Sequence, residues 1–210
     1  MLAVLKWGVS GSFLICIISL IFLVLKTFSF GRKPHYARSQ GEGKKGIFYA
    51  FGKAMMPWEK ESARRHILSY LAGIFYHGGI FVAFFYLFSL VISLELKMPF
   101  VFVFRILIGL GFICGIGIFA KRIIHTSLRK ISCPDDFAAN LMVDLFLALA
   151  FLSTFYPVLK TYFFIISSIL FLYIPLGKIR HCVLFFYVRI LFGLFYGRRG
   201  VLPQKIKFEI

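Results

Sequence analysis

The chain has 210 residues, of which 60% are hydrophobic and only 16% are charged. A mean hydropathy of +0.87 excludes an ordinary soluble domain and is typical of a small integral membrane protein. Lys and Arg outnumber Asp and Glu by 25 to 8, a formal charge of +17, yet long apolar runs separate the basic clusters. This spacing argues against a nucleic-acid-binding face.

Five apolar stretches are long enough to cross a bilayer as helices, which takes about 20 residues each. They cover residues 7–29, 66–94, 99–121, 137–157 and 158–181. The sequence therefore predicts an all-α integral membrane protein, with one five-helix transmembrane domain over residues 1–181. The remaining segment, 182–210, is predicted to be a helix lying in the membrane interface, over 182–197, followed by a cytoplasmic tail.

The distribution of cations predicts the orientation of this bundle. The segments 26–65, 121–130 and 178–210 carry ten, four and seven Lys or Arg residues. The other side carries four: Lys6, Lys97, Arg105 and Lys160. By the positive-inside rule the N-terminus is outside and the C-terminus is cytoplasmic. The long loop 30–65 is then cytoplasmic, where it can dock a soluble partner or bind acidic lipid.

Two histidines are candidate metal ligands. His77 lies eleven residues after His66 in the second predicted span, and His181 closes the fifth span on the same side. Each follows a glycine by four residues, Gly73 and Gly177. A helical side chain leans over the preceding turn, so glycine there leaves room for a flat macrocycle. Two imidazoles from facing helices commonly hold heme b. The alternative is one core histidine and one interfacial histidine.

Cations near these histidines are candidates to neutralise the heme propionates: Arg64, Arg65, Lys178 and Arg180. His66 falls on the same helical stripe as His77, about 16 Å away along the helix. It is a candidate ligand of a second heme, whose other ligand would be His125 or His35. The alternatives for His66 are a propionate contact and a docking-surface histidine.

Two motifs resemble a known family. Tyr76-His77-Gly78-Gly79-Ile80 resembles the (Phe/Tyr)-His-x-Gly-Ile motif of the cytochrome b (gamma) subunit of respiratory nitrate reductase. The stretch IPLGKIRH, 174–181, resembles that family's Phe-Pro-Phe-Ser-(Arg/Lys)-Leu-x-His. It is equally similar to the Tyr-Ile-Pro-(Tyr/Phe)-Ser-Lys-x-x-His of the membrane cytochromes of heterodisulfide-reductase-like and sulfite-reductase-associated complexes. A third match, RKISCPDD at 129–136, opens the fourth predicted span.

The resemblance implies a heme b subunit of a respiratory oxidoreductase complex in the inner (plasma) membrane of a prokaryote. Such a subunit transfers electrons between the quinone pool, menaquinone or another quinone, and a cytoplasmic iron–sulfur subunit. By position, His77 and His181 match the ligands of the heme nearer the cytoplasm. Where the family's second heme has its histidines, this chain has Leu87 and Phe163, so the outer heme is expected to be absent.

Asn140 and Asp144, four residues apart in the fourth predicted span, are candidates for a proton or quinone site. The alternative is that Asp144 is a buried partner of Lys178 or Arg180. The chain shows no iron–sulfur motif and no catalytic domain, so it is expected to be an electron-transfer component that is not catalytic alone. Two rival functions are a heme-free membrane anchor and a small transporter, although no inverted repeat favours the transporter.

Overall fold

The computed structural model describes residues 2–31 and 37–202, apart from the side chain of Ser62. Residues 32–36 and 203–210 lie outside the described residues, and with them His35 and most of the predicted cytoplasmic tail. Of the described residues 84% are helical, and none of them forms a strand. The predicted all-helical class is therefore confirmed.

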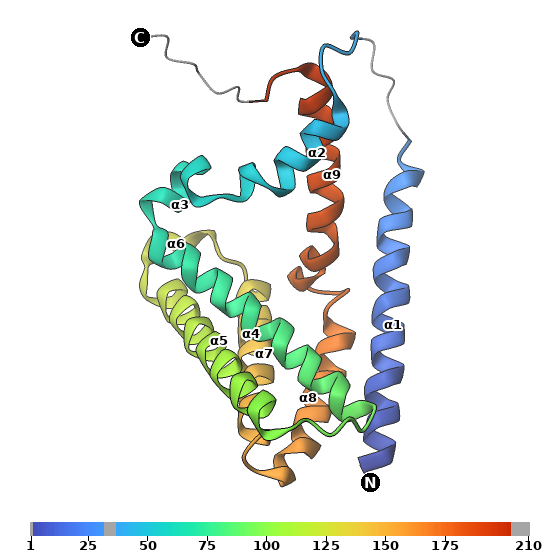
Figure 1. Ribbon diagram of the computed structural model, residues 1–210, viewed down its shortest axis with the longest axis vertical. Helices are drawn as coiled ribbons and strands as arrows, with labels where there is room; N and C mark the ends of the chain where they lie inside the picture. The colour runs from blue at the N-terminus through green and yellow to red at the C-terminus, as the bar shows by residue number, and fades with distance from the viewer. Residues whose placement is uncertain (1, 32–36, 203–210) are drawn as a thin grey trace. The chain divides into compact units, whose positions relative to one another are not determined.

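The described part of the chain forms nine α-helices (Figure 1). They are α1 (Leu2–Ser29), α2 (Gly43–Phe51), α3 (Glu61–Arg65), α4 (Ile67–Val91), α5 (Met98–Ile124), α6 (Thr126–Ile131), α7 (Pro134–Ser153), α8 (Lys160–Tyr173) and α9 (His181–Arg199). Short 3-10 helices are η1 (Lys53–Met55), η2 (Pro57–Glu59), η3 (Pro157–Leu159) and η4 (Lys178–Arg180).

Five helical segments are long and apolar enough to cross a membrane: α1, α4, α5, α7 and Lys178–Arg199, which contains α9. The predicted number of long apolar helices is therefore found, but the fifth is a different segment. Within the predicted span 158–181, α8 has only 14 residues, about 21 Å of helix against a hydrocarbon core of about 30 Å. Pro175 explains its early end, because proline has no N–H to continue the helical hydrogen bonds. The interfacial placement of 182–197 and the orientation of the termini stay predictions.

The chain divides into two compact units. Unit 1 comprises Met1–Ile21 and Leu68–Arg180, and unit 2 comprises Phe22–Ile67 and His181–Ile210. The long basic loop thus belongs to the same unit as α9. Each unit is described by itself below.

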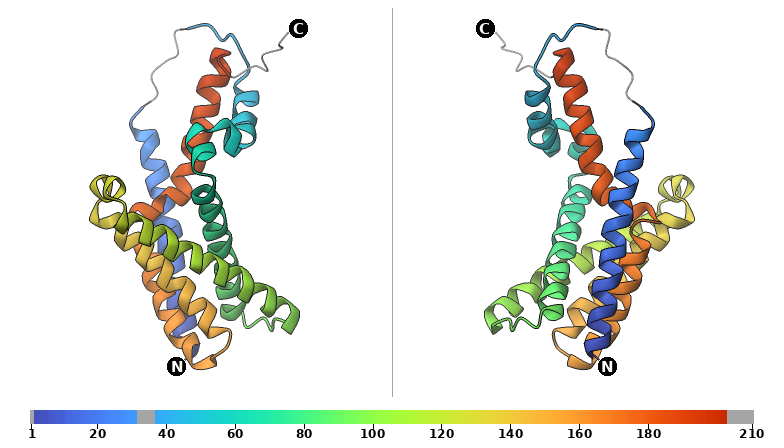
Figure 2. Two further views of the ribbon diagram at one scale, coloured as in Figure 1. Left: turned by 90° about the vertical axis from the view of Figure 1, so that its left-hand side faces the viewer. Right: turned by 90° about the vertical axis from the view of Figure 1, so that its right-hand side faces the viewer.

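The core of unit 1 is built from α4, α5, α7 and α8. Phe146, Phe163 and Leu87 are fully buried there. Helices α4 and α5 cross at Gly79 and Gly111 (Figure 2). A Cβ on Gly79 would lie 2.7 Å from the Gly111 Cα. Small residues at such a crossing let two helix backbones approach closely, as in membrane helix pairs.

Unit 2 is organised by a second glycine crossing, between α2 and α9. A Cβ on Gly46 would lie 1.9 Å from the carbonyl oxygen of Gly193 and 2.7 Å from the Cα of Gly197. Gly193 and Gly197 have the GxxxG spacing that favours close helix packing. The rings of Phe51 and Phe186 stack beside this crossing with centroids 6.1 Å apart. Part of the basic loop is therefore folded against α9.

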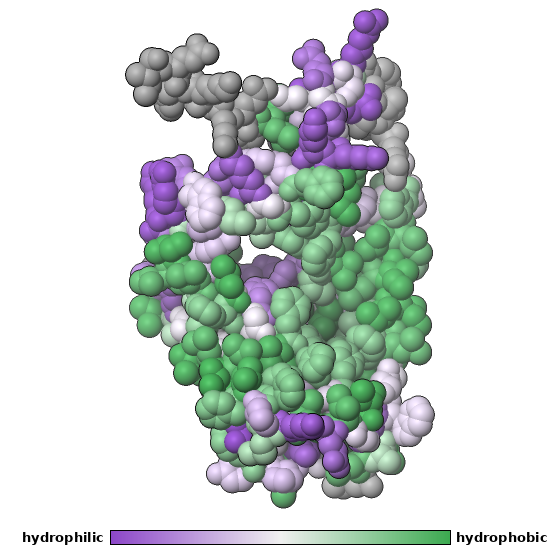
Figure 3. All heavy atoms as spheres, in the orientation of Figure 1, coloured by the Kyte–Doolittle hydropathy of each residue, from purple (hydrophilic) through white to green (hydrophobic). Residues whose placement is uncertain are grey.

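Helix α1 buries one narrow stripe, formed by Val9, Ser12, Cys16 and Leu20. The rest of its surface is hydrophobic along most of its length (Figure 3). Such a surface is unfavourable in water and is expected for a helix that contacts lipid.

Candidate functional site

His77 lies in the middle of α4 and is exposed in unit 1. Its Nδ1 is 2.7 Å from the carbonyl oxygen of Gly73, one helical turn earlier. Because a carbonyl oxygen can only accept a hydrogen bond, Nδ1 is the donor and carries the proton. Nε2 is then the ring nitrogen that could bind a metal. A backbone carbonyl on the far ring nitrogen is the usual support of a metal-ligating histidine.

The face of α4 beside His77 has room around its glycines. A Cβ on Gly73 or on Gly78 would have no neighbour within 4 Å among the described atoms. The neighbouring Gly79, by contrast, is required by the crossing with α5. Packing within the protein therefore explains Gly79 and does not explain Gly73 or Gly78.

His181 occupies a different structural position from the predicted one. It opens α9 instead of closing the fifth predicted span, because α8 ends at Tyr173 and a turn and η4 separate the two helices. The i−4 helical argument for Gly177 fails for the same reason. A Cβ on Gly177 would lie 2.5 Å from the ring of Tyr173, so this glycine makes room for that tyrosine. His77 belongs to unit 1 and His181 to unit 2, and their pairing stays a prediction.

Lys178, a predicted propionate contact, is held by two aspartates of α7. Its backbone N–H donates to Asp135 Oδ2 at 2.8 Å. Its Nζ donates to Asp136 Oδ2 at 2.7 Å. Arg122 also contacts Asp136, with Nη1 3.5 Å from Oδ1. A propionate would therefore have to compete with an existing carboxylate for Lys178. Arg64, Arg65 and Arg180 are exposed, and Arg65 forms an ion pair with Glu61.

The sequence analysis did not assign Asp135 and Asp136, which contact Lys178, to any site. The backbone N–H of Cys133 donates to Asp136 Oδ2 at 2.8 Å, completing a capping box at the start of α7. The Tyr173 hydroxyl donates to Asp135. The sequence does contain a signal for this arrangement, since Cys-Pro-Asp-Asp places proline in the first helical turn and acids beside the helix N-terminus. Asp135 and Asp136 thus bind the start of α7 to the turn that follows α8.

His66 is a turn residue between α3 and α4. The predicted stripe with His77 required one continuous helix through both, and α4 begins only at Ile67. The stripe argument for a second heme ligand is therefore lost. His125 caps the N-terminus of the short helix α6.

Asp144 and Asn140 lie together, as predicted, and both are buried. Asn140 Nδ2 donates to Asp144 Oδ2 at 2.9 Å and to the Tyr76 hydroxyl at 3.3 Å. Asp144 Oδ1 has no hydrogen-bond partner among the described residues. A Cβ on Gly115 would lie 2.2 Å from this oxygen. Tyr76 and Gly115 are therefore members of the polar site that the sequence analysis missed.

Tyr76 connects this polar site to His77. The rings of the two residues lie edge to face, with centroids 5.9 Å apart. The alternative prediction for Asp144 was a pair with Lys178 or Arg180, but Lys178 pairs with Asp136 instead. A buried carboxylate, an amide and a phenol thus lead to the predicted heme ligand from inside unit 1.

Within the described residues no group of three or more His, Cys, Asp or Glu side chains is placed to hold a metal ion. A bare ion would need such a group, because protein side chains would have to supply most of its ligands. A heme needs fewer protein ligands, since its macrocycle supplies four nitrogens.

Comparison of the chain with protein-family models, with curated proteins and with solved structures finds no match. The resemblance to membrane cytochromes b therefore rests on the motif residues alone and stays a prediction.

Proposed function

We propose that this chain is a heme b membrane subunit that transfers electrons between the quinone pool and an iron–sulfur subunit on the cytoplasmic side. The observation that carries the proposal is the hydrogen bond from His77 Nδ1 to the Gly73 carbonyl, at 2.7 Å. It orients the ring and makes Nε2 the proposed ligand atom. The histidine lies in a long apolar helix, where ionisable groups are costly and usually functional.

One heme per chain is the proposed content, with His77 and His181 as axial ligands. The bound group supplies one-electron chemistry at its iron, and the axial ligands and their burial set its potential. Arg64, Arg65 and Arg180 are the proposed propionate partners. Leu87 and Phe163, at the positions of the second heme's ligands in the similar family, are both 0% exposed. Core packing thus occupies both positions, which supports a single heme.

Asp144 is the proposed proton site, together with Asn140 and Tyr76. A quinone takes up two protons with two electrons, so its chemistry in the membrane needs a route for protons. A buried carboxylate with one oxygen lacking a partner can accept or donate a proton without breaking an ion pair. The sequence neighbours Tyr76 and His77 would couple that proton to the redox state of the heme.

The test is a dithionite-reduced minus oxidised spectrum with heme quantification, on the purified full chain. We expect one heme per chain in the wild type and its loss in His77→Ala and in His181→Ala. His125→Ala is the matched control and should retain the heme. Two hemes per chain would contradict the single-heme proposal and would make His66 a candidate ligand of the second heme.

A heme-free membrane anchor is the second candidate function. It is favoured by unit 2, where the glycine crossing of α2 and α9 presents exposed cations, among them Lys44, Lys45, Arg198 and Arg199. Such a surface suits an acidic partner or anionic lipid. Absence of a heme absorption band from a folded protein that still copurifies with a redox partner would favour this function over the first.

A further inference from the structure

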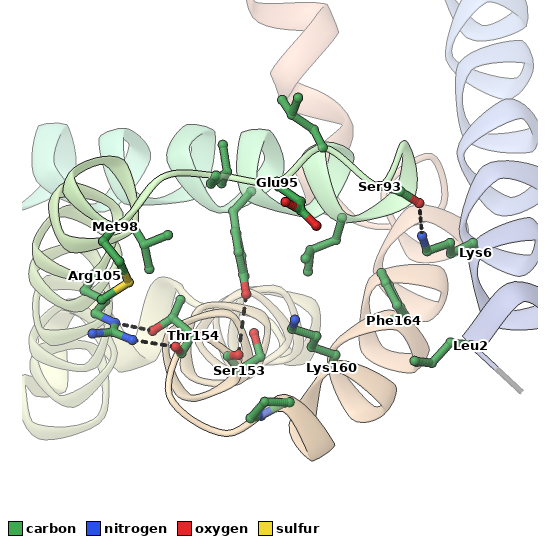
Figure 4. Close-up of a pocket in the computed structure, with 16 residues that line it drawn as sticks. Leu2, Lys6, Ser93, Glu95, Met98, Arg105, Ser153, Thr154, Lys160 and Phe164 are labelled. Carbon is green, nitrogen blue, oxygen red and sulfur yellow. Dashed lines mark hydrogen bonds between the residues drawn. The ribbon is translucent and has the colours of Figure 1, made fainter.

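Unit 1 contains a cavity of about 540 Å³ that is separate from the His77 and Asp144 region. It lies at the end of the unit where α4 and α7 finish and α5 and α8 begin (Figure 4). Much of its wall is apolar, with side chains of Leu2, Leu90, Met98, Val101 and Phe164. A hydrocarbon chain could therefore lie along it without loss of hydrogen bonds.

Cations converge on this cavity from three different helices. Lys6 of α1, Arg105 of α5 and Lys160 of α8 all line it. These are three of the four cations that the sequence places on the cation-poor side of the bundle. Among the described lining residues the acidic side chain is that of Glu95. The positive-inside rule disfavours cations on this side, so their convergence needs another explanation.

Neither Arg105 nor Lys6 is paired with a carboxylate in the described structure. Arg105 donates to the Thr154 hydroxyl at 3.0 Å and to its carbonyl oxygen at 2.6 Å. Lys6 Nζ donates to the Ser93 hydroxyl at 2.6 Å. No described carboxylate therefore neutralises either cation, and both side chains line the cavity.

Lys160 is the cation with the strongest need for a counter-ion. Its side chain points into the cavity, as does that of Glu95 (Figure 4). The Lys160 side chain forms no hydrogen bond or ion pair with any residue that the structure describes, and its backbone N–H is bonded to carbonyl oxygens of η3. The residue is also half-buried. A partly desolvated cation is costly unless an anion neutralises it.

The helix ends add to the positive potential. Leu2, Met98 and Lys160, the first residues of α1, α5 and α8, all line the cavity. The N-terminus of a helix carries a partial positive charge, which favours phosphate and other anions, and at α8 this charge acts without a free N–H on Lys160, which is bonded to η3. Trp7, Tyr156 and Tyr162 are exposed near the same end, and such rings mark the level of the lipid headgroups.

We propose that this cavity binds the phosphate headgroup of an anionic phospholipid, such as phosphatidylglycerol. Lys160 is the main phosphate contact, Lys6 and Arg105 supply the surrounding positive charge, and the apolar wall holds the start of an acyl chain. A neutral quinone would leave three cations facing one carboxylate, so the charge favours an anion. The apolar wall favours a lipid over inorganic phosphate. This site is independent of the heme proposed above.

The experiment measures lipid binding to the delipidated full chain in mild detergent, by thermal shift and by native mass spectrometry. The probes are phosphatidylglycerol, phosphatidylcholine and inorganic phosphate. We expect phosphatidylglycerol to raise the melting temperature with increasing concentration, with smaller effects of the other two. Lys160→Gln should weaken phosphatidylglycerol binding about tenfold, the usual loss for a charged hydrogen bond.

The chain offers a matched control, because Lys97 is the fourth cation on this side and does not line the cavity. Lys97→Gln should bind phosphatidylglycerol as the wild type does, and Lys160→Arg should retain most of the affinity. If Lys160→Gln does not fold, Lys6→Gln provides the same test. Equal binding by the wild type and both cavity variants would overturn the proposal. A full effect of inorganic phosphate alone, or tighter binding of phosphatidylcholine, would also overturn it.

Discussion

The two ends of unit 1 hold their charges in opposite ways. At the start of α7, Asp136 contacts both Lys178 and Arg122, and Asp135 accepts from Tyr173 and from a backbone N–H. At the cavity end, Arg105 and Lys6 donate to neutral oxygens, and the Arg105 guanidinium lies over the Phe155 ring, 4.0 Å from its centroid. The Lys160 side chain has no hydrogen bond or ion pair with any of the described residues.

This difference indicates which charged side chains contribute to the stability of the fold. Paired charges at the α7 end join segments that are distant in the sequence, and removing one leaves its partner unsatisfied. Charges at the cavity end leave no carboxylate unpaired when they are removed. We therefore expect substitutions at the α7 end to affect stability, and substitutions at the cavity end to affect binding.

The largest effect on stability is expected at Asp136. Asp136→Ala removes two ion pairs and the capping box together, at a cost of about 2 to 3 kcal/mol. Asp136→Asn should cost less, since its amide oxygen can still accept from the Cys133 N–H. The measurement is thermal or denaturant unfolding in detergent. Glu61→Gln, in an exposed pair with Arg65, is the control and should change little. An equally small loss of stability in Asp136→Ala would contradict the expectation that charges at the α7 end stabilise the fold.

An intermediate effect is expected between the two ends, at Gly115. A Cβ there would lie 2.2 Å from Asp144 Oδ1 and 2.5 Å from the Tyr76 ring. Gly115→Ala must therefore displace the polar site, and we expect a loss of about 1 to 2 kcal/mol. Gly117→Ala is the matched control, because a Cβ at Gly117 would have no neighbour within 4 Å in the part of the chain that the structure describes. If both variants have the same free energy of unfolding, the close contact at Gly115 does not affect stability.

A smaller effect of opposite sign is expected at Asp144. Asparagine has the same shape without the charge, so Asp144→Asn should stabilise unit 1 by up to about 1 kcal/mol. The same variant should slow the oxidation of reduced heme by a quinone, measured by stopped-flow absorbance. Loss of stability with an unchanged rate would make Asp144 a structural residue and exclude it from proton transfer.

The smallest effect on stability is expected at Lys160. Without added lipid, Lys160→Gln should change the free energy of unfolding by less than about 0.5 kcal/mol, because no described partner is lost. Unfolding of the delipidated protein, with Lys97→Gln beside it, measures this. A loss of stability comparable to that of Asp136→Ala would show that Lys160 contributes to the stability of the fold.

Much of the helical framework could be predicted because it depends on local properties of the sequence. Long apolar runs predicted α1, α4, α5 and α7, since a helix satisfies its own backbone in lipid. The end of α8 was missed although Pro175 signalled it, because the apolar run continues through the proline. Part of the polar site was predicted as well, since Asn140 and Asp144 are one helical turn apart.

The helical class and the long apolar helices α1, α4, α5 and α7 could be predicted from the sequence, because they depend on residues within a few turns of one helix. Three contacts follow from the tertiary structure alone: Lys178 binds Asp136, Asn140 donates to the Tyr76 hydroxyl, and Lys6, Arg105 and Lys160 line one cavity. Those residues lie on different helices, and helix periodicity does not determine which helix packs against which. The positions of close approach depend on glycines such as Gly79 and Gly111, whose role appears only when two backbones meet.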